Sequence, residues 1–128
     1  MSLRSPLGRV LGLGSAREGT HHWWVQRLTS VALVPLTIWF VVSLLLLPSL
    51  DYSTVIAWMG ESSTALALVV LVLVATWHSQ LGMRVIVEDY VHANGAKTVT
   101  LIALTFAHVL IAVAGVFAVL KVALGAPR

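Results

Sequence analysis

The sequence predicts an all-α integral membrane protein with three transmembrane helices. Of its 128 residues, 59% are hydrophobic and 10% are charged, with a mean hydropathy of +0.95, whereas about 25% of residues are charged in soluble domains. Three long apolar stretches carry almost no charge. A chain of this length has room for about three spans of 20 residues and their connections. We therefore expect a single membrane domain over residues 1–128.

The composition excludes several kinds of chemistry for this chain. It contains no cysteine, which rules out disulfides, a thiolate haem ligand and cysteine-ligated iron–sulfur clusters. Lysine and arginine outnumber aspartate and glutamate by 8 to 5, but they lie at the ends of the apolar stretches, which indicates membrane orientation and no nucleic-acid binding. With no room for a soluble catalytic domain, difficult chemistry here requires a cofactor or partner chains.

Residues 1–22 form a basic stretch interrupted by glycines and Pro6. This predicts a cytoplasmic tail lying irregularly against the membrane surface, and a disordered extension fits the same composition. The apolar run that follows exceeds the roughly 7–15 residues of a secretory signal. An arginine-rich mitochondrial presequence is an alternative, but proline and glycine interrupt its amphipathic helix, which favours a bacterial protein.

The first span is expected over residues 24–47. Trp23 and Trp24 suit its start, because amphipathic indole rings settle at the membrane interface. Pro35 lies inside the span and cannot donate to the helical hydrogen-bond ladder, which predicts a kink. The next connection, residues 49–62, holds acidic and aromatic residues and no base, as expected at the opposite membrane surface.

The second and third spans are expected over residues 62–84 and 98–120, joined by a polar connection with an Asn94-Gly95 turn. Six basic residues lie on the side of the N-terminus and this connection, and two on the side of the C-terminus: Arg4, Arg9, Arg17, Arg27, Arg84 and Lys97, against Lys121 and Arg128. Because cytoplasmic segments carry the excess of lysine and arginine, the count places the N-terminus in the cytoplasm.

The most unusual polar residues gather near the end of the second span. His78 follows an apolar run, residues 65–77, with a single threonine. Hydrocarbon offers an imidazole no hydrogen-bond partner, so His78 either bonds a neighbouring helix or has a function. If the helix continues through Asp89, that carboxylate returns to within about 20° of the His78 direction, roughly 16 Å further along the axis.

The spacing of His78-Ser79, Gly82 and Asp89-Tyr90 resembles the small cytochrome b-type membrane anchor subunit of succinate dehydrogenase, the D chain. The resemblance implies that His78 is an axial ligand to the iron of a haem b held between two anchor subunits. It also implies that Tyr90 hydrogen-bonds the headgroup of the substrate ubiquinone. Asp89 would then orient the phenol or conduct protons, while an interfacial aromatic role also fits Tyr90.

A second match lies upstream, where Gly19-Thr20-His21 and Arg27 resemble the stretch before the first membrane helix of that family. The resemblance implies that Arg27 and His21 lie near the haem propionates or the quinone. Arg27 also fits a structural role in which it snorkels to lipid phosphates. His108, in the third span, is a further candidate ligand: an intrachain pair with His78 is geometrically possible, whereas the resemblance implies a second ligand from a partner chain.

The resemblance thus implies a subunit of succinate:ubiquinone oxidoreductase, respiratory complex II, in the bacterial inner membrane or alternatively the mitochondrial one. Its partners would be a second cytochrome b anchor subunit, an iron–sulfur subunit, a flavoprotein subunit and membrane lipid, with succinate oxidised on the other chains. Two alternatives stay open. They are the anchor of a quinol:fumarate reductase, and a small transporter or assembly protein whose His and Asp relay protons.

Overall fold

The computed structural model describes the backbone of residues 16–125 and the side chains of residues 20–125. This part of the chain contains four helices and no strand: α2 (Ala16–Leu45), α3 (Tyr52–Gly60), α4 (Ser62–Tyr90) and α5 (Asn94–Gly125). Three of them, α2 from Thr20 onward, α4 and α5, are long and apolar enough to cross a membrane. The predicted all-α fold with three membrane helices is confirmed.

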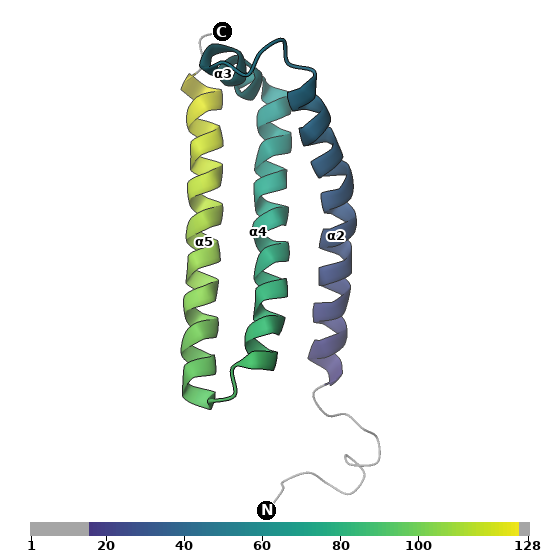
Figure 1. Cartoon of the computed structure of the whole chain (residues 1–128), viewed down its shortest axis with the longest axis vertical. Coiled ribbons are helices and arrows are strands. Elements are labelled where there is room, and N and C mark those ends of the chain that lie inside the picture. The colour runs from purple at the N-terminus through teal and green to yellow at the C-terminus, as the bar shows by residue number, and fades with distance from the viewer. Residues whose placement is uncertain (1–15, 126–128) are drawn as a thin grey trace, which may run out of the picture.

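The long helices run side by side with α4 in the middle, and α3 lies across one end (Figure 1). α4 packs against both α2 and α5, and α3 contacts α4 and α5. Successive long helices run in opposite directions, so the start of α2, the end of α4 and the start of α5 lie at the same end of the bundle (Figure 1). One side of α4 therefore faces α2 and another faces α5.

Most large apolar side chains point outward. Leu28 is 69% exposed, Val113 62% and Phe106 66%, a pattern that is unfavourable in water and that lipid tails satisfy. A small buried cluster, Ala65, Leu68 and Val119, joins α4 to α5 at the end covered by α3. Most of the apolar surface of this chain is thus left for lipid or partner chains to cover.

Helix α3 was not predicted. Its N-cap is Asp51, whose carboxylate accepts hydrogen bonds from the backbone N–H of Thr54 at 2.8 Å and from the hydroxyls of Ser49 at 2.6 Å and Ser53 at 2.9 Å. These donors, Ser49 first, hold the pKa of Asp51 well below its usual range. The carboxylate therefore stays charged at neutral pH, where it suits the positive end of the helix.

The far end of α3 is fixed by aromatic packing. The Trp58 ring stacks on Trp39 of α2, with centroids 6.3 Å apart and an interplanar angle of 24°. Phe40 lies at 6.2 Å from the same ring. These contacts contribute stability beyond the area that they bury, and they tie α3 to α2 across the end of the bundle.

The helix ends differ from the sequence expectation. α2 begins at Ala16, so residues 16–22 are helical rather than irregular, while residues 1–15 of the expected tail lie outside the described range. α4 continues beyond the expected span of residues 62–84 to Tyr90, so His78 and Asp89 lie on one helix, and no proline or glycine interrupts residues 85–90. The Asn94-Gly95 pair begins α5 and is not a turn. Pro35 lies within α2, which curves along its length in Figure 1.

Gly115 allows α5 to approach α4 closely. A Cβ atom at this position would lie 2.8 Å from Cγ1 of Val72, and the β-branched Val72 has little freedom to rotate away. We expect Gly115→Ala to destabilise the folded protein by about 1–3 kcal/mol, the usual cost of overpacking. Thermal unfolding of the purified protein in detergent measures this change.

The matched control is Gly95→Ala in the same helix, where a Cβ would meet nothing within 4 Å. That variant should unfold at or slightly above the wild-type temperature, because alanine favours a helix over glycine. Adding Val72→Ala to Gly115→Ala should restore stability. Equal unfolding temperatures for the two single glycine variants would contradict the proposed close contact.

Candidate functional site

His78 lies in the middle of α4, partly buried, with its ring turned toward α2. Its Nδ1 is 2.9 Å from the hydroxyl oxygen of Thr29, and its Nε2 is 3.4 Å from the amide nitrogen of Gln26. Thr29 is buried, with 6% of its surface exposed. One ring nitrogen thus has a firm protein partner, and the other has only a long contact.

This arrangement fits the axial haem ligand that the sequence predicts. A histidine that binds a metal through one nitrogen almost always donates its other N–H to the protein, and Nδ1 of His78 has such a partner in Thr29. Beside Nε2, the Oε1 atom of Gln26 is buried without a hydrogen-bond partner among residues 20–125. The Gln26 side chain therefore still has an acceptor without a donor on the Nε2 side of the ring, where a ligand would bind.

The described residues contain no group of three histidine, cysteine, aspartate or glutamate side chains that could hold a bare metal ion. This does not bear on a haem, whose iron needs only one axial nitrogen from this chain because the porphyrin supplies the equatorial ligands. The candidate site is therefore a single histidine on one helix and its partners on the next.

His108 lies on α5 and contacts a different side of α4 from the one that faces α2. Its Nδ1 lies 2.8 Å from the carbonyl oxygen of Leu104, to which it donates, and its Nε2 lies 3.3 Å from the hydroxyl of Ser79. His78 instead contacts Thr29 and Gln26 of α2. The two imidazoles therefore have no shared partner, which argues against an intrachain pair of ligands.

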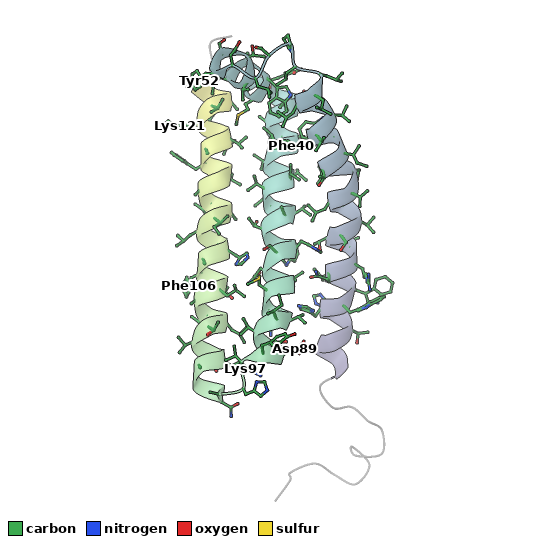
Figure 2. All side chains as sticks on the ribbon, viewed as in Figure 1. Phe40, Tyr52, Asp89, Lys97, Phe106 and Lys121 are labelled. Carbon is green, nitrogen blue, oxygen red and sulfur yellow. The ribbon has the colours of Figure 1, made fainter. Side chains whose placement is uncertain are left out.

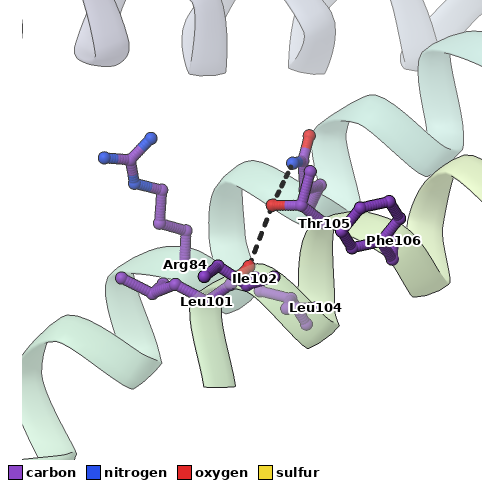
Figure 3. A pocket seen from close by; sticks show the side chains of 7 residues that line it. Arg84, Leu101, Ile102, Leu104, Thr105 and Phe106 are labelled. Atoms are coloured by element: carbon purple, nitrogen blue, oxygen red, sulfur yellow. Dashed lines mark hydrogen bonds between the residues drawn. The ribbon is translucent and has the colours of Figure 1, made fainter. Parts of the chain in front are cut away.

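Two grooves lie between α4 and α5, apart from the contacts of His78. One, of about 300 Å³, is lined by Gln80, Arg84 and Thr105 with four apolar residues of α5, and Gln80 donates to Thr105 at 3.3 Å (Figure 3). The other, of about 450 Å³, is mostly apolar and includes His108. Neither groove includes His78, Asp89 or Tyr90.

Asp89 and Tyr90 occupy the last turn of α4. The helix is unbroken from His78 to Tyr90. Tyr90 therefore lies about 18 Å from His78 along the helix axis, at 1.5 Å per residue. Both side chains are exposed, Tyr90 at 79%. Figure 2 shows Asp89 and Lys97 at the end of the bundle where α2 begins, and Tyr52 at the opposite end.

Two basic residues at this end, Arg84 and Lys97, contact Glu88, the neighbour of Asp89. Arg84 pairs with the Glu88 carboxylate at 2.8 Å, and Lys97 donates to the Glu88 carbonyl oxygen at 2.8 Å. Asp89 takes part in neither contact. Its exposed carboxylate is consequently available to a partner chain, a quinone or water.

His21 lies near the start of α2, at the same end of the bundle as Asp89 (Figure 1). Arg27 lies about 9 Å further along the helix, next to Gln26, which contacts His78. His21 and Arg27 are both exposed, and the Arg27 guanidinium lies 5.5 Å from the centre of the Trp23 ring in a cation–π contact. Gln26 and Thr29, by contrast, reach His78. The structure does not bring Arg27 or His21 to His78, so a role for them requires a partner chain or a bound cofactor.

Comparison with known proteins identifies the family of this chain. A model of the family described as succinate dehydrogenase/fumarate reductase transmembrane subunit matches residues 1–114. The chain belongs to this family. No solved structure matches it. The resemblance to the membrane anchor of succinate dehydrogenase, predicted from His78 to Tyr90, is confirmed.

Relatives in this anchor family match along most of their length. The succinate dehydrogenase hydrophobic membrane anchor subunit of Rickettsia bellii is 30% identical over 116 residues, covering 91% of this chain and 93% of that protein. The same subunit of Paracoccus denitrificans is 33% identical over 122 residues, covering 95% and 94%. The succinate dehydrogenase membrane anchor subunit of Reclinomonas americana is 27% identical over 97 residues, covering 73% and 80%.

The α2 residues near His78 in this anchor-family chain were not predicted from the sequence. His22, Gln26 and Thr29 follow one another at helical spacing on α2, and Gln26 and Thr29 contact His78. The Nε2 atom of His22, like Oε1 of Gln26, is buried without a partner among the described side chains. Their shared spacing at the start of an apolar helix was the available signal.

Proposed function

We propose that this chain is the small membrane anchor of a succinate:ubiquinone oxidoreductase and that, with a second anchor subunit, it holds a haem b through His78. The observation that carries the proposal is the His78 ring, tied to Thr29 at Nδ1 and in only a long contact at Nε2. Membership of the anchor family supports the assignment. A bound haem b supplies a one-electron carrier inside the membrane.

Tyr90 and Asp89 are proposed to form this chain's share of the ubiquinone-reduction site. The exposed phenol can donate to a quinone carbonyl, where negative charge grows during reduction. The neighbouring carboxylate can orient the phenol or pass protons from water. His21 lies near the start of α2, at the same end of the bundle, and Arg27 lies closer to the height of His78; there they would meet haem propionates or the quinone.

The remaining chemistry belongs to the proposed partners. Succinate is oxidised on a flavoprotein subunit, and electrons reach the quinone through an iron–sulfur subunit docked beside Asp89 and Tyr90. The second anchor subunit supplies the other haem ligand and covers part of the exposed apolar surface, and lipid covers the rest. We place this assembly in the bacterial inner membrane with its soluble subunits in the cytoplasm, as the distribution of basic residues favours.

The proposed orientation predicts which side of the membrane each connection faces. A tag inserted at Ala93, between α4 and α5, should be cleaved by protease in inside-out vesicles, and a tag after Arg128 should be cleaved only in right-side-out vesicles or spheroplasts. The reverse pattern would place Asp89 and Tyr90 on the outer surface. The soluble subunits could then not dock in the cytoplasm.

A visible spectrum of the purified complex tests the proposed function. A reduced b-type haem spectrum that co-purifies with succinate:quinone reductase activity supports it and eliminates the proton-relay transporter. A complex without haem would overturn the assignment of His78. The family also includes fumarate reductases, so the ratio of succinate oxidation to fumarate reduction identifies the preferred direction.

A further inference from the structure

Thr29 is a buried polar side chain in the middle of a membrane helix. Only 6% of its surface is exposed, and its hydroxyl faces α4 at the height of His78. A buried hydroxyl must use both its proton and its lone pairs, because leaving either unpaired costs free energy. Three atoms lie within hydrogen-bond distance of the Thr29 oxygen, and they show where its proton and its lone pairs are used.

The proton of the Thr29 hydroxyl goes to its own helix. The oxygen lies 2.9 Å from the carbonyl oxygen of Val25 and 3.0 Å from that of Gln26, and a carbonyl oxygen can only accept. If the hydroxyl donated to His78 instead, its lone pairs would face two carbonyl oxygens at these short distances, an arrangement that is electrostatically repulsive. The proton is therefore shared between the two carbonyls.

The contact with His78 must then use a lone pair of Thr29. Nδ1 of His78 lies 2.9 Å from this oxygen, so Nδ1 carries the proton and donates it. In a neutral imidazole this leaves the lone pair on Nε2. The amide nitrogen of Gln26, 3.4 Å from Nε2, agrees, because an amide nitrogen can only donate and so faces an acceptor.

We infer that Thr29 is a positioning residue that fixes His78 in the Nδ1-protonated tautomer and thereby reserves Nε2 for the haem iron. This rests on the proposed function and extends it to a residue on another helix. The acceptor on Nδ1–H also makes the imidazole more basic, which favours oxidised iron. Through His78, Thr29 thus affects both the affinity for haem and the midpoint potential of the haem.

The experiment uses the whole purified complex with three variants. Thr29→Val keeps the shape of the side chain and removes the hydroxyl, and Thr29→Ser keeps the hydroxyl. Thr76→Val is the matched control, because the Thr76 hydroxyl also donates to carbonyls of its own helix, at 2.7 Å to Val72 and 3.1 Å to Leu73, but has no hydrogen bond to a histidine in the described part of the chain. The readouts are the rate of haem transfer to excess apomyoglobin and the haem midpoint potential.

Thr29→Val should release haem roughly 10- to 100-fold faster, the usual effect of removing a partner of a metal-bound histidine, and its potential should shift positive. Thr29→Ser and Thr76→Val should behave like the wild type. If Thr29→Val does not assemble, Thr29→Ala compared with Thr29→Ser makes the same test with a smaller side chain.

Wild-type haem retention and potential in an assembled variant without the hydroxyl would overturn the role of Thr29. Equal effects of Thr29→Val and Thr76→Val would also overturn it, because both would then reflect helix stability. The His78→Ala variant separates these results from the proposed function. If it loses haem while Thr29→Val does not, only the inference about Thr29 fails; if it retains haem, the assignment of His78 fails as well.

Discussion

Replacing His78 by alanine is expected to lower the haem content of the assembled complex by more than about tenfold. Loss of a partner of a metal-bound histidine already costs roughly 10- to 100-fold in affinity, and loss of the ligand itself should cost at least as much. The pyridine haemochrome content per complex and the dithionite-reduced spectrum measure the change. Neither readout depends on quinone turnover.

His108→Ala is the matched control, because it also removes a partly buried imidazole from a membrane helix of the same chain. His108 makes its hydrogen bonds to Leu104 and Ser79, away from Gln26 and Thr29. We expect this variant to keep its haem and its spectrum. If His108→Ala loses haem and His78→Ala does not, His108 and not His78 is the haem ligand.

The membrane helices could be predicted because hydrocarbon leaves the chain few choices. A span must satisfy its backbone internally and exclude charge, so uncharged stretches of some 20 residues locate α2, α4 and α5. Beyond the hydrocarbon this constraint ends and local preferences take over. The helices accordingly extend past the expected spans, as at Tyr90, where an uninterrupted sequence continues α4 into the polar region.

Helix α3 illustrates a second limit. It has nine residues, and so short a helix is not stable on its own but depends on packing. Its N-cap, Asp51, is recognisable in the sequence, but the stacking of Trp58 on Trp39 joins residues far apart in the chain. That contact follows only from the arrangement of the bundle.

The candidate site divides in the same way. A lone imidazole within an apolar run identifies His78 from the sequence, because membranes rarely tolerate such a group without a function. Its partners on α2 could not be chosen with certainty, because polar residues occupy several sides of the first half of that helix and the sequence does not fix which side faces α4. Only the packed structure shows that Gln26 and Thr29 lie there while Arg27 faces outward.

Tyr90→Phe is expected to slow quinone reduction by succinate about 100- to 1,000-fold. The substitution keeps the ring but removes the hydroxyl proposed to donate to the quinone carbonyl, and a positioned donor to a developing negative charge contributes about 2.7–4 kcal/mol to lowering the barrier. Transfer of electrons from succinate to an artificial acceptor that bypasses the quinone should stay near the wild-type rate. Haem content should also be unchanged, because Tyr90 lies about 18 Å along α4 from His78.

Tyr52, the only other tyrosine in the sequence, is the matched control. The two phenols are similarly exposed, Tyr52 at 83% and Tyr90 at 79%, but they lie at opposite ends of the bundle. If the phenols serve only as interfacial anchors, Tyr52→Phe and Tyr90→Phe should have equally small effects on turnover. Under the proposed donor role, only Tyr90→Phe slows quinone reduction, and full activity of that variant in an assembled complex would reject the role.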